Sequence, residues 1–184
     1  RNPNIYLMDE PLSSLDAKLR EELRIELKKI QKDLNATILY VTHDHVEATT
    51  MADRIGVLKD GVLSQVGTPE EIYDNPNSIY VANRLGSPKI NIFDLDKTKI
   101  PSKNKATHAG IRPEDISITN KGNYDVYIET VELLGAETVI SFKSDNVNGM
   151  LLTQTSDTFE EGKKIKIALN NKKMLYFDNN GMRI

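Results

Sequence analysis

Two short segments of the chain carry side chains suited to phosphate chemistry. Asp9 and Glu10 directly follow the apolar run 5–8, and His43 follows a second apolar run, 38–41. A carboxylate can hold Mg²⁺ through water, a neighbouring carboxylate can polarise an attacking water, and an imidazole can hydrogen-bond a terminal phosphate. In open α/β sheets, ligands gather at the carboxyl ends of parallel strands, where we expect both segments to lie. The residue types therefore fit three parts of a nucleotide hydrolysis site.

Each of these segments also has a purely structural explanation. Asp and Pro favour turns, so the sequence from Asp9 to Pro11 is about as well explained by a turn after a strand. The segment SSLD at 13–16 fits a helix N-cap, with Ser13 or Ser14 as the cap and Asp16 placed favourably against the helix dipole. A single histidine at a strand end is usually structural.

The elements that would position these residues alternate between strand and helix. Residues 5–8 are continuously apolar, which is typical of a parallel strand buried on both faces. Residues 14–35 carry apolar side chains at helical spacing, and 38–41 should pair in parallel with the first strand through a right-handed crossover. A short helix over 44–53 follows. A third strand at 55–58 and a hairpin turn at 60–61 that returns through 62–66 would end the same sheet.

A change of pattern near residue 86 predicts a second domain. Thr68, Pro69 and Glu71 form a capping box that begins a short helix, and a further helix from about Ser78 would be closed by Gly86. Beyond this point polar and apolar residues alternate, most clearly at 164–169, and glycines separate the runs. We predict an α/β domain over 1–85 and a small all-β barrel over 86–184.

Three motifs in the first half resemble those of ABC ATPases. IYLMDEP at 5–11 is similar to the Walker B strand, SSLD at 13–16 to the D-loop, and VTHDHVEA at 41–48 to the switch-histidine loop. The resemblance implies that residues 1–85 are the C-terminal portion of a nucleotide-binding domain with a P-loop NTPase sheet. It also implies site roles for these residues: Asp9 supports Mg²⁺ through water, Glu10 is the general base, His43 senses the γ-phosphate, and Ser13, Ser14, Leu15 and Asp16 lie at the seam of an ATPase dimer.

The second half resembles the sugar-importer group of these ATPases. The matching segments are LGSPKIN at 85–91, GIRPEDI at 110–116, VELLGAET at 131–138 and YFDNNGMRI at 176–184. They imply an OB-type, TOBE-like regulatory domain over 86–184, and they make Arg112, Pro113 and Glu114 candidate regulatory residues. A structural explanation remains equally open, in which Pro113 interrupts an edge strand and Arg112 pairs with a neighbouring carboxylate at the surface.

Composition excludes several other classes of protein. The 184 residues include no cysteine, which excludes disulfides, thiolate nucleophiles and cysteine zinc sites. The net charge of −3 argues against a nucleic-acid partner. No apolar run approaches the roughly 20 residues of a spanning helix, so we expect any membrane role to be peripheral.

The phosphate-binding loop of an ATPase is missing from the sequence. No GxxxxGK[ST] segment and no Gly-Gly signature element occur in it. We therefore expect the chain to be the C-terminal fragment of a longer protein and to neither bind ATP tightly nor hydrolyse it alone, because backbone amides and a lysine around the phosphates are absent.

The resemblance as a whole implies the energising subunit of a sugar importer. The full-length protein would use ATP and Mg²⁺, pair with a second ATPase subunit and bind transmembrane permease subunits at the cytoplasmic face of the membrane. An extracellular substrate-binding protein would be an indirect partner. Two alternatives stay open at this point: a non-catalytic regulatory β-barrel module, and the ATPase subunit of a polyamine or iron importer.

Overall fold

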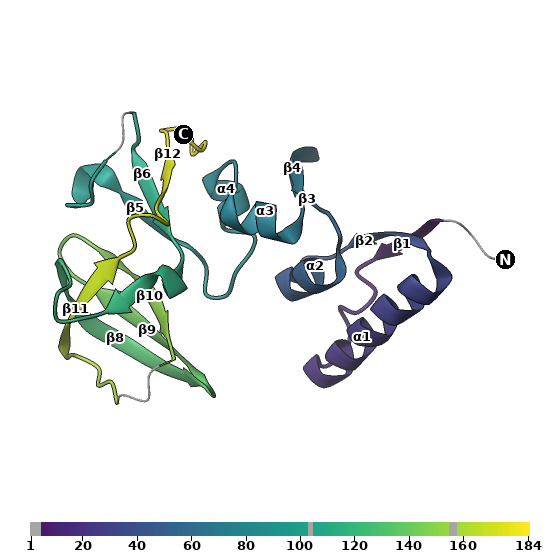
Figure 1. Ribbon diagram of the computed structural model, residues 1–184, viewed down its shortest axis with the longest axis horizontal. Helices are drawn as coiled ribbons and strands as arrows, with labels where there is room; N and C mark the ends of the chain where they lie inside the picture. Colours follow the sequence, from purple (N-terminus) through teal and green to yellow (C-terminus); the bar gives the residue numbers. More distant parts are fainter. Residues whose placement is uncertain (1–4, 103–104, 155–157) are drawn as a thin grey trace. The chain divides into compact units, whose positions relative to one another are not determined.

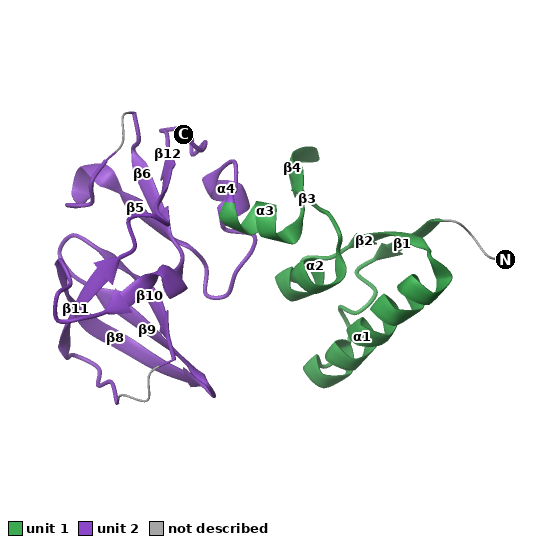
Figure 2. Cartoon of the chain, viewed as in Figure 1, with its two compact units in different colours: residues 1–74 green, residues 75–184 purple. Residues whose placement is uncertain are grey.

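The computed structural model describes residues 5–102, 105–154 and 158–184. The chain divides into two compact units, residues 1–74 and 75–184 (Figure 2). The first unit alternates helices and strands, and the second consists mostly of strands (Figure 1). An α/β half followed by an all-β half is the order that the sequence predicts.

The elements of the first unit follow the predicted order. They are β1 (Ile5–Asp9), α1 (Ala17–Leu34), β2 (Thr37–Val41), α2 (His45–Met51), β3 (Ile55–Lys59), β4 (Val62–Gly67) and α3 (Pro69–Asp74). β1 and β2 pair in parallel, with Asp9 opposite Val41, which confirms the predicted crossover pair. β3 and β4 form the predicted antiparallel hairpin around Gly61, whose φ of 78° lies in the left-handed region.

Two predictions about the sheet are wrong. β3 and β4 form a two-stranded sheet of their own and do not extend the β1–β2 pair. The first strand is also not buried on both faces, because Ile5, Leu7 and Leu39 are 60%, 77% and 61% exposed. A continuous apolar run indicates what a strand can bury, whereas burial itself requires a second layer of elements. No described element covers this face of the β1–β2 pair.

Local hydrogen bonds explain where the helices begin. The Asp16 side chain accepts from the backbone N–H of Leu19 at 3.1 Å, so α1 begins at Ala17 and the cap is Asp16, not Ser13 or Ser14. At α3, Thr68 Oγ1 accepts from the Glu71 N–H at 3.2 Å, and the Glu71 carboxylate accepts from the Thr68 N–H at 2.8 Å. This reciprocal pair confirms the predicted capping box.

The second unit contains two sheets. Its elements are α4 (Ile79–Ala82), β5 (Asn91–Asp94), η1 (Leu95–Lys97), β6 (His108–Ile111), η2 (Pro113–Asp115), β7 (Ile116–Ile118), β8 (Tyr124–Leu134), β9 (Glu137–Lys143), β10 (Asn148–Thr153), β11 (Lys164–Leu169) and β12 (Leu175–Phe177). Five strands pair in the order β10-β9-β8-β11-β7, and three pair in the order β12-β6-β5. Side chains of both sheets, including Phe93, Ile111, Phe142 and Ile167, share one buried core.

A side chain, not a strand ladder, connects the two sheets at β5 and β10. Asn91 is 7% exposed, and its amide accepts from the Met150 N–H at 2.7 Å and donates to the Met150 carbonyl at 2.8 Å. Gly149 permits this approach, because a Cβ there would clash with Asn91 Oδ1. Each sheet keeps two edge strands, and no closed barrel is found among the described residues. Among the described residues, the predicted small barrel takes the form of two sheets around one core.

The helix α4 belongs to the second unit. Ala82 packs with Ile90, Leu175 and Phe177 in a buried cluster. The compact units accordingly divide at 74/75, before the predicted domain boundary at 85/86. The boundary at 85/86 separates the nucleotide-binding and TOBE-like domains that the family resemblance implies, and it stays a prediction.

Candidate functional site

The two predicted site segments meet at the carboxyl ends of β1 and β2. The Glu10 N–H donates to the Val41 carbonyl at 2.8 Å, which extends the parallel pairing one residue beyond β1. His43 lies two residues after β2, and its Nδ1 is 2.9 Å from Glu10 Oε1. The structure thus brings together the general-base candidate and the histidine, which are 33 residues apart in the chain.

The Glu10 backbone is strained. Its φ is 44°, in the left-handed region that non-glycine residues seldom adopt. This turn directs the chain from β1 toward Pro11 while the Glu10 side chain stays at the strand end beside His43. Strain of this kind is concentrated at functional sites.

The Glu10–His43 contact is solvent-exposed, with side-chain exposures of 44% for Glu10 and 75% for His43. The hydrogen bond that the Glu10 carboxylate accepts from the His43 ring raises the pKa of His43 above its ordinary value, because the carboxylate stabilises the imidazolium. The contact therefore contributes to folding stability below the ordinary imidazole pKa, and that contribution is lost as pH rises through the raised value.

Replacing the carboxylate tests this electrostatic coupling. We expect Glu10→Gln to lower the pKa of His43, because the neutral amide stabilises the imidazolium less than the carboxylate does. An NMR titration of the His43 ring protons in both proteins measures the difference. Glu22→Gln, which makes the same chemical change at an exposed position on α1, should leave the His43 titration unchanged and is the matched control. An unchanged His43 titration in Glu10→Gln would show that the contact does not persist in solution.

Asp9 is an exposed carboxylate at the end of β1. The described residues contain no cluster of three His, Cys, Asp or Glu side chains that could hold a metal ion. Mg²⁺ usually keeps several waters and binds proteins through one or two carboxylates together with phosphate oxygens. The exposed Asp9 carboxylate at this strand end fits that type of site.

The candidate D-loop is ordered by its own hydrogen bonds. Ser13 Oγ donates to the Glu10 carbonyl at 2.9 Å, and the Leu15 N–H donates to the carbonyl of the buried Leu12 at 3.2 Å. Ser14 is exposed, and Asp16 caps α1. The segment therefore has both the structural function suggested by its sequence and exposed side chains. Its position at a dimer seam stays a prediction.

Arg20 connects the D-loop segment to the histidine loop, and sequence reasoning missed it. Its Nη2 donates to the Leu15 carbonyl at 2.8 Å, and its Nη1 lies 3.4 Å from the Asp44 carboxylate. Asp44 in turn caps α2 by accepting from the N–H groups of Val46 and Glu47. The sequence did contain a signal for this contact. Arg20 lies in the first turn of a helix, where the dipole disfavours a cation unless an anion compensates it.

Sequence reasoning also missed a pair of residues that flank His43 in the chain, Tyr40 before it and Glu47 after it. Tyr40 donates its hydroxyl to the Glu47 carboxylate at 2.9 Å, and Glu47 is 3% exposed. Burial and the neighbouring Glu47 carboxylate raise the pKa of Tyr40 well above its usual range, so the phenol stays protonated. The pair joins β2 to α2 on either side of the histidine loop.

The candidate regulatory residues lie in the second unit. Arg112 is 5% exposed, so its predicted surface position is wrong. Its Nη1 donates to the carbonyls of Ala82 at 3.1 Å and Leu85 at 2.7 Å, where a cation also stabilises the C-terminus of α4. Pro113 is fully buried at the start of η2, and Glu114 is exposed. Arg112 therefore has a structural function in this unit.

None of the helices in the described part of the chain is long and apolar enough to span a bilayer.

Comparisons with known proteins identify the family of the chain. The TOBE domain family matches residues 109–177. A trehalose/maltose import ATP-binding protein of Thermococcus litoralis is 36% identical, over 97% of this chain and 56% of that protein. The sn-glycerol-3-phosphate import ATP-binding proteins of Psychromonas ingrahamii and Brucella abortus are 45% and 46% identical, over 78% and 76% of this chain and 43% and 44% of theirs. The chain spans about half the length of the curated relatives it matches. With its TOBE domain, the chain is homologous to the ATP-binding proteins of sugar and glycerol-phosphate ABC importers.

Proposed function

We propose that this chain is part of an ATP-hydrolysing subunit that energises the import of sugars or glycerol phosphate through an ABC transporter. The observation that carries the proposal is the 2.9 Å contact between Glu10 and His43 at the carboxyl ends of two parallel strands. A carboxylate and an imidazole held at such an edge can act on a water and on a phosphate that share the same site. The named import functions of the relatives support the same class of substrate.

Each site residue has a distinct role in this proposal. Glu10 accepts a proton from the attacking water, and His43 orients that carboxylate while it hydrogen-bonds the terminal phosphate. Asp9 would hold Mg²⁺ through water, and the bound ion would supply positive charge beside the phosphates. Ser13 to Asp16 lie at the seam with a second ATPase subunit, and Arg20 keeps this segment in register with the histidine loop.

The partners in this proposal are transmembrane permease subunits and a second ATPase subunit at the cytoplasmic face of the membrane. The TOBE domain regulates the pair. An extracellular binding protein that delivers the solute is an indirect partner, and no nucleic acid takes part. The experiment that tests this function is purification of the full-length protein from membranes, followed by reconstitution in vesicles with the permease that accompanies it. We expect ATP-dependent uptake of a sugar or of glycerol 3-phosphate, and uptake of only a polyamine or iron would contradict the assignment.

The 184-residue chain alone is expected to be inactive. It has no GxxxxGK[ST] segment, so it lacks the backbone amides and lysine that hold the β- and γ-phosphates. We expect no phosphate release from ATP above the buffer background in a colorimetric assay and no saturable ATP binding by calorimetry. The full-length protein at the same molar concentration is the positive control. Turnover by the chain alone would contradict the claim that ATP hydrolysis requires the phosphate-binding loop.

A further inference from the structure

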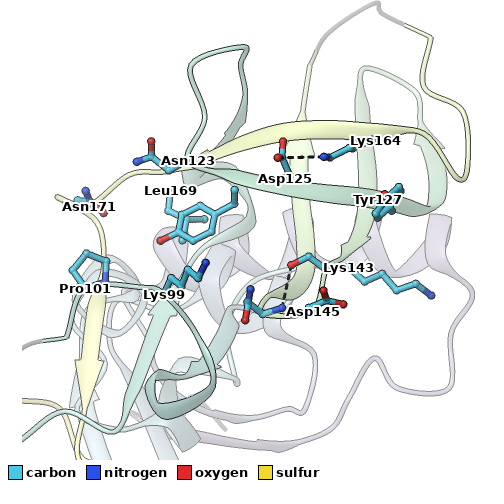
Figure 3. A pocket seen from close by; sticks show the side chains of 13 residues that line it. Lys99, Pro101, Asn123, Asp125, Tyr127, Lys143, Asp145, Lys164, Leu169 and Asn171 are labelled. Atoms are coloured by element: carbon cyan, nitrogen blue, oxygen red, sulfur yellow. Dashed lines mark hydrogen bonds and ion pairs between the residues drawn. The ribbon is translucent and has the colours of Figure 1, made fainter.

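The second unit contains a polar recess at one end of its five-stranded sheet. The recess has a volume of about 700 Å³ and is lined by the start of β8, the end of β9, both ends of β11 and the segment after η1 (Figure 3). This volume is within the range of small-ligand sites. The side chains important for the argument are Lys99, Asn123, Asp125, Tyr127, Asp145 and Lys164.

Cross-strand pairing places the Tyr127 ring between two lysines in the recess. Tyr127 of β8 lies opposite Lys143 of β9 and opposite Lys164 of β11, so the three residues form a row across neighbouring strands. Asp125 lies two residues before Tyr127 and therefore on the same face of the sheet. Tyr127 is 51% exposed, which leaves the ring available to a ligand.

The lysines differ in how their charges are compensated. Lys143 pairs with Glu129 at 2.7 Å, so its charge is largely neutralised. Asp125 is shared by Lys164 at 3.3 Å and Lys166 at 3.4 Å, which leaves this trio with one excess positive charge. Lys99 makes no ion pair with another of the described residues. Asp145 supplies the remaining carboxylate of the lining.

These groups provide three kinds of contact at once. Uncompensated lysines bind phosphate oxygens through charge-assisted hydrogen bonds. Asn123, Asp125 and Asp145 can bond hydroxyl groups, and the Tyr127 ring offers an apolar face to a carbon skeleton. A neutral sugar would not use the charge of Lys99, and inorganic phosphate would not use the ring.

We propose that this recess is a binding site for a small phosphorylated polyol, with Lys99 and Lys164 on the phosphate and Tyr127 against the carbon chain. The site lies wholly within the second unit and is independent of the proposed ATPase chemistry. Occupancy of such a site would let the β domain respond to the concentration of a phosphorylated metabolite.

NMR titration of the 184-residue chain with glycerol 3-phosphate tests the proposal. We expect saturable shifts of the amide signals of residues 123–127, 143–146 and 164, with glycerol causing none at equal concentration and inorganic phosphate binding more weakly. Lys99→Ala should weaken binding by about tenfold, whereas Lys89→Ala, which removes the same charge from an exposed position outside the recess, should change it less than about twofold.

Asp125→Asn is a second test variant, which we expect to strengthen ligand binding where Lys99→Ala weakens it. Removing this carboxylate frees both lysines that share it, so we expect glycerol 3-phosphate to bind about threefold more tightly. A Lys99→Ala variant that keeps its dispersed spectrum and binds as the parent does would overturn the proposal, as would glycerol binding equally well. Inorganic phosphate binding as tightly as glycerol 3-phosphate would overturn the assignment of Tyr127 and the polyol contacts. None of these results depends on ATP, so they test the site separately from the proposed function.

Discussion

Glu10→Gln is expected to lower the ATP turnover of the full-length protein by about 10²- to 10⁴-fold, which is the contribution of a positioned general base. The amide keeps the size of the side chain and can still hydrogen-bond His43 Nδ1, which is 2.9 Å from the carboxylate in the structure. It cannot accept a proton from water at neutral pH. ATP affinity should therefore be nearly unchanged, and the nucleotide should stay bound without being hydrolysed.

Single-turnover kinetics and equilibrium ATP binding, measured on the same preparation, separate the two effects. Glu22→Gln is the matched control, because it makes the same chemical change at an exposed position on α1. It should retain the turnover of the parent protein. A Glu10→Gln protein that hydrolyses ATP at the parental rate would refute the assignment of Glu10 as the base. Loss of ATP binding together with turnover would instead assign Glu10 to nucleotide binding.

Arg112→Ala is expected to lower the free energy of unfolding of the second unit by about 3 kcal/mol, because it removes a buried charged donor from two carbonyls. Those acceptors belong to Ala82 and Leu85, which are 0% and 3% exposed, so water cannot readily replace the guanidinium. The free energy of unfolding of Arg112→Lys should lie between those of the parent protein and Arg112→Ala, since an ammonium keeps the charge but not the planar fork of donors.

Urea unfolding of the whole chain, followed by amide signals of residues 109–177, measures this loss. Arg84→Ala is the matched control: Arg84 is exposed, donates to the Tyr80 hydroxyl at 2.7 Å and stacks 4.4 Å above the Tyr80 ring. A contact of this exposed type contributes about 0.5–1 kcal/mol. Equal losses in the two variants would show that Arg112 is not a buried anchor.

Short-range features of the fold could be read from the sequence. The hairpin at Gly61 and the capping box at Thr68 are formed as predicted, because each depends on hydrogen bonds and backbone angles within a few residues. The parallel pairing of β1 and β2 could be read as well, since a strand, a long helix and a strand have few ways to connect.

Long-range features could not be read in this way. The burial of Arg112 depends on the segment that ends α4, 27 residues earlier in the chain. The connection between the two β sheets depends on Asn91, which bonds Met150 across 59 residues. Alternating and charged patterns predict which residues can face water, but they do not specify which backbone a particular side chain will meet.

For the candidate site, the sequence by itself determined the chemical groups and the elements that carry them: carboxylates after one strand and a histidine after the next. Only the tertiary structure decided that Glu10 and His43 touch, that Glu10 is held in a strained backbone, and that Arg20 joins Leu15 to Asp44. The physical reason is that residue types and local periodicity are properties of a short segment. A contact over 24 or 33 residues depends on the register in which two strands pair and on how the intervening helix returns the chain.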